Sequence, residues 1–193
     1  NIISTELYEK DLTKNDEEFR DTLYEIKPDA QILQYVHFDV IHDPCGLTTG
    51  AERDDCTCET AKPYSNNVAW LPQDICDIIA HHPDWFLRDK HGNYIYNENF
   101  IYMDPGNQEW REFWLDRVKY SQEVLGWNGV YLDNVEGSIG RQTSGDMGLL
   151  FYDDETYRQQ VNGFLQYIYE VYFEPEGIQV YANIIGAEQT STW

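Results

Sequence analysis

The feature of this chain that most constrains its fold is the alternation of helical patterns with short apolar runs. Phe19, Leu23 and Ile26 recur at helical spacing, and Pro28 ends the pattern. The largely apolar run 31–38 follows after a short break. A helix, a short connection and a buried strand form the repeating unit of parallel β/α proteins, so this part of the chain predicts such a unit.

Further apolar runs and helical patterns continue the alternation. Residues 100–103, 129–133 and 178–185 have strand character, and residues 110–125 and 157–171 carry apolar side chains at helical spacing. Together with the first run, these are the expected strands of one parallel sheet and the helices that connect them.

We therefore expect an α/β fold in which residues 1–193 form a single domain of the TIM-type (β/α) barrel class. A complete eight-fold barrel typically needs about 250 residues. We accordingly expect a partial or truncated barrel whose first strand is weak, with Ile2 and Ile3 as its remnant.

Two of the expected strands lead into a carboxylate, at Asp104 and at Asp133. A β/α barrel carries its chemistry at the carboxyl ends of its strands, so both are candidates for a functional site. Pro105 follows Asp104, and this pair also fits a helix N-cap with proline at the first helical position. The ordinary alternative for Asp133 is a carboxylate that caps a turn or faces solvent.

The irregular stretch 42–70 holds or adjoins all four cysteines, which are Cys45, Cys56, Cys58 and Cys76. A loop of this length in a compact domain is usually functional or cross-linked. The even count and the C-x-C spacing favour two disulfides, with a metal site or free thiols as the alternatives. Cys56 and Cys58 would then pair with Cys45 and Cys76, in either order.

The net charge of −22 argues against several partners. It repels the phosphates of nucleic acids and anionic membrane surfaces. No apolar run approaches the 18 residues of a spanning helix, so we expect no membrane insertion. Acidity and disulfides together favour a secreted or extracellular protein, whose oligomeric state stays open.

The segments Pro83–Leu87, Tyr102–Asn107 and Gly126–Asn134, in this order, resemble glycoside hydrolases with a TIM barrel that are related to the α-galactosidase and endo-galactosaminidase groups. In that family a G-[WF]-[ND]-G-[VI]-x-L-D segment forms barrel strand four, and its last Asp is generally a catalytic carboxylate. The resemblance extends over about residues 20–185. It implies sugar chemistry and assigns the catalytic position to Asp133.

Cleavage of an O-glycosidic bond in a poly- or oligosaccharide usually requires two carboxylates, one that protonates the leaving oxygen and one that attacks C1 or activates water. Asp133 is our candidate for the nucleophile or stabilising anion. Glu136, in the following loop, is the candidate for the second group. Asp39 and Glu188, which follow the first and last strands, are the alternatives.

Other residues are expected to bind the sugar. Aromatic residues make up 15% of the chain, with 15 Tyr and 6 Trp, and aromatic rings stack on pyranose faces or pack in the core. The predicted substrate-binding residues lie at strand ends or in loops: His37, Asp104, Tyr131, Asn183, Trp85 and Trp70.

Three alternatives compete with a glycoside hydrolase. One is a non-catalytic carbohydrate-binding or structural module on the same scaffold. Another is a metal-dependent hydrolase using His37, Asp39, Asp104 and Asp133, although no H-E-x-x-H pattern is present. Calcium at the acidic stretch 52–55 is a third, without an EF-hand pattern. The G-x-S-x-G and G-x-G-x-x-G patterns are absent, and we expect no cofactor.

Overall fold

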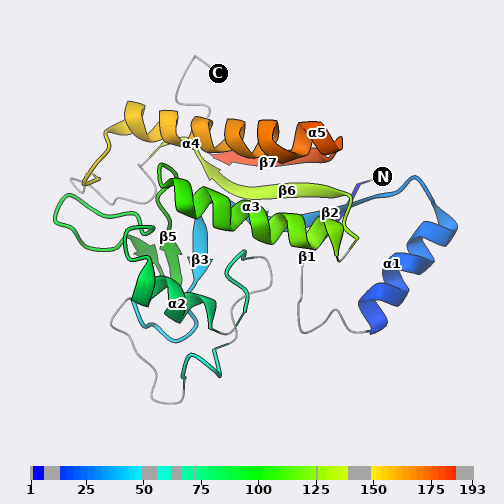
Figure 1. The fold of residues 1–193 in the computed structure, drawn as a ribbon, viewed down its shortest axis with the longest axis horizontal. Helices are drawn as coiled ribbons and strands as arrows, with labels where there is room; N and C mark the ends of the chain where they lie inside the picture. Colours follow the sequence, from blue (N-terminus) through cyan, green and yellow to red (C-terminus); the bar gives the residue numbers. More distant parts are fainter. Residues whose placement is uncertain are drawn as a thin grey trace.

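The computed structural model describes residues 2–6, 14–48, 56–61, 67–71, 73–124, 126–138 and 149–185 (Figure 1). Its centre is a four-stranded parallel sheet with the order β1-β2-β6-β7. The strands are β1 (Ile2–Glu6), β2 (Gln31–His37), β6 (Gly129–Glu136) and β7 (Gln179–Ile185). The fold is thus a mixed α/β structure built on a parallel sheet, and the weak first strand expected at Ile2 and Ile3 is present as β1.

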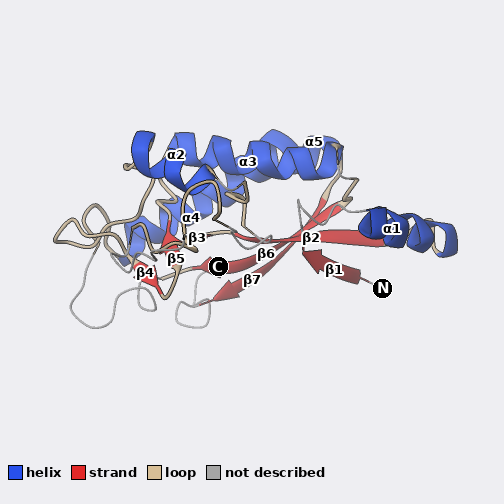
Figure 2. Cartoon of the chain, turned by 90° about the horizontal axis from the view of Figure 1, so that it is seen from below, coloured by secondary structure: helices blue, strands red, loops and turns tan. Residues whose placement is uncertain are grey.

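The helices that precede β6 and β7 cover one side of the sheet, whereas the helix that precedes β2 lies beyond the end of the sheet (Figure 2). The placement of the two covering helices follows from the right-handed crossover rule for parallel strands. The helix α1 (Lys14–Ile26) precedes β2, and α3 (Gln108–Glu123) precedes β6. Before β7, α4 (Asp154–Ile168) continues through a π-helical turn (Tyr169–Phe173) into α5 (Glu174–Glu176).

The core lies between the sheet and these helices. Trp110, Trp114 and Val118 share one face of α3 and are fully buried, as their spacing predicts. The ring of Phe164 on α4 meets Trp114 edge to face, with centroids 5.6 Å apart. Val130 and Leu132 of β6 belong to the same buried cluster. This packing fixes which face of β6 points toward the helices.

The opposite face of the sheet carries aromatic and polar side chains, and no described helix covers it (Figure 2). Tyr35, Tyr131 and Tyr181 stand in one row across β2, β6 and β7. The rings of Tyr35 and Tyr131 stack with centroids 5.7 Å apart. Two residues further along these strands, and on the same face, His37 is paired with Asp133. This face therefore leads directly to the predicted catalytic residue.

The motif before Asp133 is explained by close strand packing at the start of β6. Asn128 accepts a hydrogen bond from the amide of Ile32 (2.7 Å) and donates one to the carbonyl of Ala30 (3.0 Å). A side chain at Gly129 would collide with the side chain of Leu33. These residues hold the start of β6 against β2, and Asp133 lies toward the other end of the strand.

A second, antiparallel sheet corrects the expected strand count. It has the order β3-β5-β4, with β3 (Val40–His42), β4 (Tyr96–Asn97) and β5 (Phe100–Tyr102). The run 100–103 was expected in the parallel sheet, and this is wrong: β5 pairs antiparallel with both neighbours. The tight connection from β4 allows only an antiparallel hairpin. In consequence β6 lies directly beside β2 and is the third strand of the parallel sheet, not the fourth.

The expected N-cap at Asp104 is also wrong. Asn107 caps α3, because its side chain accepts a hydrogen bond from the amide of Trp110 at 3.0 Å. Residues 91–93 form the turn of a hairpin that is closed by the antiparallel bridge between Arg88 and Tyr94. Of the helices described, none is both long and apolar enough to cross a membrane.

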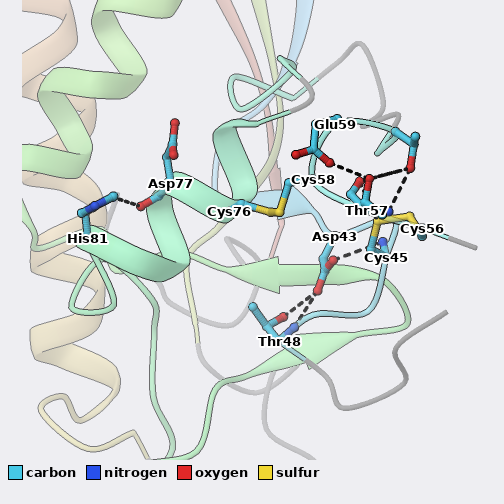
Figure 3. The surroundings of a disulfide bond; sticks show 11 residues. Asp43, Cys45, Thr48, Cys56, Thr57, Cys58, Glu59, Cys76, Asp77 and His81 are labelled. Carbon is cyan, nitrogen blue, oxygen red and sulfur yellow. Dashed lines mark hydrogen bonds between the residues drawn. A yellow bond between two sulfur atoms is a disulfide. The ribbon is translucent and has the colours of Figure 1, made fainter. Parts of the chain in front are cut away.

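Two disulfides hold the irregular excursion, as the cysteine pattern predicted (Figure 3). Cys45 is bonded to Cys56, and Cys58 is bonded to Cys76 on α2 (Asp74–His81). The buried carboxylate of Asp43 accepts hydrogen bonds from the amides of Cys45 and Thr48 at 3.2 and 2.8 Å. The acidic stretch considered for calcium, residues 52–55, lies outside the described residues.

Candidate active site

A β-bulge at the carboxyl end of β6 brings two acidic side chains to the same face of the sheet. β6 and β7 are in register up to Leu132, and the register shifts between Leu132 and Val135. Asn134 lies within this shift and has a positive φ of 55°. Because the extra residue breaks the strict alternation, Val135 returns to the buried core and Glu136 joins the face of Asp133.

The carboxylate of Asp133 is held by both neighbouring strands. The hydroxyl of Tyr35 on β2 donates a hydrogen bond to Oδ2, and the amide of Asn183 on β7 donates one to Oδ1 at 2.9 Å. Burial raises the pKa of Asp133. The two hydrogen bonds, the amide of Asn134 and the nearby His37 lower it by a larger amount, so the pKa lies below its ordinary value. Asp133 is therefore an anion at neutral pH.

Beside this carboxylate is a pocket of about 260 Å³. The residues that line it come from the ends of β2 and β6 and from the antiparallel sheet: His37, Val40, Asn97, Glu98, Phe100, Tyr102, Asn134 and Glu136. The ring of His37 lies nearly parallel to that of Phe100, with centroids 5.5 Å apart. The second sheet thus supplies one wall of a pocket whose other wall is the end of the parallel sheet.

Glu136 is only 3% exposed, although it lines the pocket. Asp39, which follows β2, is also buried. Both carboxylates lie close enough to Tyr157 on α4 to affect its pKa. Burial has the largest effect and the charges of Asp39 and Glu136 add to it, so the pKa of the Tyr157 phenol is raised well above its ordinary value. Tyr157 is therefore a neutral hydroxyl beneath the acidic end of the sheet.

Asp104 occupies a different environment from Asp133. Its Oδ1 accepts hydrogen bonds from the amide of Gly106 (2.7 Å) and the hydroxyl of Tyr152 (2.8 Å). Burial raises the pKa of Asp104, and the charge of Asp84 adds to this, while both hydrogen bonds and the charge of Arg111 lower it; the net shift is upward. Neither Asp104 nor Asp133 is itself among the described residues that line the pocket, but the residue after Asp133, Asn134, and its strand partner, His37, are.

Of the other predicted sugar-binding residues, the structure brings His37, Tyr131 and Asn183 together around Asp133. The two tryptophans lie elsewhere. Trp70 is buried in a cluster with Ile32 at the start of β2. Trp85 is also buried and packs on the ring of His82, with centroids 4.0 Å apart. At 6% and 5% exposure, Trp70 and Trp85 do not present an open ring face on which a sugar could stack.

Several residues of the site were not singled out from the sequence. Tyr35 lies on the same strand face as His37, so the period of two along β2 contained a signal for it. Asn134 and Glu98 both depend on backbone geometry, a bulge and a hairpin turn, for which the sequence gives no clear signal. Within the described segments, no group of three or more His, Cys, Asp or Glu side chains is arranged to hold a metal ion.

A comparison with known protein families identifies the family of this chain. Residues 54–168, more than half of the chain, match the hypothetical glycosyl hydrolase family 15. The chain belongs to this family. The family match confirms the resemblance to glycoside hydrolases drawn from the sequence. The matched residues 54–168 include Glu98, Asp133 and Glu136, whereas Tyr35 and Asn183 lie outside them.

No curated protein matches the chain. Among solved structures, a hypothetical protein from Ruminiclostridium thermocellum is 16% identical, with a TM-score of 0.41 over 55% of this chain and 51% of its own. A maltogenic α-amylase from Thermotoga neapolitana is 16% identical, with a TM-score of 0.48 over 88% of this chain and 28% of its own. An uncharacterized protein from Listeria monocytogenes, solved with glucose, magnesium and calcium, is 14% identical, with a TM-score of 0.49 over 97% of this chain and 17% of its own. The chain thus spans at most about half the length of these proteins.

Proposed function

We propose that this protein is a glycoside hydrolase that cleaves O-glycosidic bonds of a poly- or oligosaccharide, with Asp133 as a catalytic carboxylate. The observation that carries the proposal is the hydrogen bonding of Asp133, whose two oxygens accept from Tyr35 and Asn183 on the flanking strands. Such bonds favour the charged form and fix its orientation, which a group that must stabilise a positively charged transition state requires.

The proposal includes the architecture around this residue. We propose that the parallel sheet is part of a TIM-type barrel and that residues 1–193 belong to one domain. The helices on one face and the polar, aromatic opposite face support this, because a barrel has its helices outside and layered side chains inside. An apolar groove of about 320 Å³ between α4 and the edge strand β7 is where a further β/α unit of such a barrel would pack.

In the proposed reaction, Glu136 donates a proton to the glycosidic oxygen as the bond from that oxygen to C1 breaks. Asp133 supplies the negative charge that faces the oxocarbenium-like C1, either by attacking it or by activating the water that does. Tyr35 and Asn183 are positioning residues that hold Asp133. His37 and Tyr131 lie on the same face of the sheet and are the proposed contacts for sugar hydroxyls and the sugar ring.

The disulfides support a location outside the reducing cytosol, since disulfides persist in oxidising compartments. We therefore propose that the protein acts on carbohydrate in an extracellular setting.

Kinetics with a panel of neutral oligosaccharides and aryl glycosides test the catalytic roles. We expect Asp133→Asn to lower turnover of all substrates by about a thousandfold, equivalent to about 4 kcal/mol of transition-state stabilisation. Glu136→Gln should slow natural substrates but largely spare aryl glycosides with a good leaving group, which needs no protonation.

Near-normal turnover by Asp133→Asn would remove this residue from the mechanism. Calorimetric binding of an oligosaccharide by the wild-type protein, without any turnover across the panel, would instead favour the non-catalytic carbohydrate-binding module.

A further inference from the structure

The turn between β4 and β5 carries a carboxylate into the pocket of Glu136. In this hairpin Asn97 pairs with Phe100, so Glu98 and Asn99 are the two connecting residues. Asn97 and Glu98 both line the 260 Å³ pocket. Glu98 is exposed at its mouth, whereas Glu136 is 3% exposed. The pocket thus has an acidic group at its mouth and another in its wall.

The backbone of Glu98 is in a conformation that glutamate disfavours. Its φ is 56°, in the left-handed region, and Asn99 is not among the residues with a positive φ. A two-residue hairpin turn with a positive φ only at its first central position normally carries glycine there. A glutamate at such a position lowers stability, and residues retained at this kind of cost cluster at functional sites.

Carboxylates predominate among the charged side chains of the pocket, where His37 is the one described lining residue that can carry a positive charge. Glu98 and Glu136 are its acidic lining residues, Asp133 adjoins it, and no Lys or Arg is among the described residues that line it. The chain as a whole has a net charge of −22. A bound group with a negative charge would meet these carboxylates in a partly enclosed space, where water screens charges less than in bulk solution. Repulsion of this kind is a common basis for specificity.

We propose that Glu98 is a specificity-determining residue that accepts hydrogen bonds from the hydroxyl or ammonium groups of a sugar and excludes sugars carrying a carboxylate or sulfate. The substrate class is then a glycan without anionic groups at this subsite. This inference rests on the proposed function, because the pocket is the one assigned to Asp133 and Glu136.

The test compares the binding of a neutral oligosaccharide with that of the same oligosaccharide oxidised at C6 to the uronic acid. Both are measured by calorimetry on the Asp133→Asn background, so that no turnover is needed. We expect the parent to prefer the neutral form by at least tenfold. Glu98→Gln should reduce this preference about fivefold, and Glu98→Lys should reduce it further. The matched control, Glu176→Gln, removes one exposed carboxylate from α5, at the other end of the sheet, and should leave the preference unchanged.

A second variant separates function from structure. Glu98→Gly relieves the left-handed backbone and removes the carboxylate, so the melting temperature should rise by a few degrees while neutral-sugar affinity and selectivity both fall. An unchanged preference in Glu98→Gln and Glu98→Lys, or a lower melting temperature in Glu98→Gly, would overturn the inference. Its failure is distinguishable from that of the proposed function. If the Glu98 variants shift the binding preference but the wild-type protein hydrolyses no substrate, the role of Glu98 is supported and the proposed catalysis is overturned. If the wild-type protein hydrolyses glycosides but the Glu98 variants leave the preference unchanged, the proposed catalysis is supported and the role of Glu98 is overturned.

Discussion

Two aspartates of this chain follow strand-like runs in similar ways, and the structure gives them opposite environments. Asp133 stands in the parallel sheet, where side chains from both neighbouring strands donate to it. Asp104 follows an antiparallel strand and is held by its own turn and by Tyr152. The pKa of Asp133 is lowered, and that of Asp104 is raised.

The difference lies in what surrounds the strand, not in the residue that ends it. Parallel strands bring their carboxyl ends to one edge of the sheet, so Tyr35, Asp133 and Asn183 meet although they are far apart in the chain. An antiparallel hairpin places consecutive strand ends on opposite sides. Asp104 therefore meets the amide of Gly106 in its own turn and the hydroxyl of Tyr152 from the loop before α4, not side chains of flanking strands. In this chain, the side chains that hold Asp133 come from the two strands that flank it in the parallel sheet.

The largest expected contrast is in turnover. Asp133→Asn should lower kcat/KM by about a thousandfold, because it removes the charge that faces C1. Asp104→Asn should stay within about threefold, since an amide oxygen still accepts hydrogen bonds from Gly106 and Tyr152. Steady-state kinetics on the best neutral substrate measure both. Equal losses in the two variants, with both proteins folded by circular dichroism, would contradict the separation of the two sites.

Much of the parallel layer was predictable from the sequence. Helical spacing in α3 and α4 and the apolar strands β2 and β6 gave the correct element types, because burial on one helix face or in a sheet leaves a direct periodic record. The apolar and β-branched residues of β7 indicated a strand although they are partly or fully exposed. The strand at residues 100–103 was also recognised. Its partner was not, because a strand of three residues carries no information about pairing direction. The pairing was set by the hairpin with β4 and by the nearby β3.

The site was predictable in part for the same reason. Asp133, His37 and Asn183 stand near the ends of recognised parallel strands, and the structure brings them together. Trp70 and Trp85 were expected in the sugar site because of their chemistry, but large apolar rings are also core material, and both are buried. The common face of Asp133 and Glu136 depends on one extra residue in β6, which no sequence period reveals.

The bulge that distinguishes β6 from β5 can be tested at Asn134. A β-branched residue is strongly disfavoured at a positive φ, so Asn134→Val should lower the free energy of unfolding by about 1–2 kcal/mol. It should also lower turnover at least tenfold by displacing Glu136. Asn134→Gly keeps the backbone accessible and should change stability by less than about 1 kcal/mol. Urea unfolding measures the stabilities.

Asn97→Val is the matched control for this prediction, because it makes the same replacement in the extended strand β4. It should cost little stability, since valine favours strands. If Asn134→Val and Asn97→Val were equally stable, the bulge would not be what fixes the end of β6.

The smallest expected effect is on the pH dependence of stability, and there the two aspartates should act in opposite directions. The folded-state pKa of Asp133 is lowered, so its contribution to stability is present above the unfolded-state pKa of about 3.9 and is lost as pH falls through the folded value. The folded-state pKa of Asp104 is raised, so its contribution is present below about 3.9 and is lost as pH rises through the folded value. Urea midpoints between about pH 2.5 and 7 should therefore fall less on acidification in Asp133→Asn than in the wild type, and more in Asp104→Asn.

Carboxyl carbon NMR shifts give the two pKa values directly, and Tyr35→Phe should raise that of Asp133 by removing a donor to the charged form. If both carboxyl groups titrated on the same side of about 3.9, their environments would be alike, and the distinction between the two strand ends would be lost.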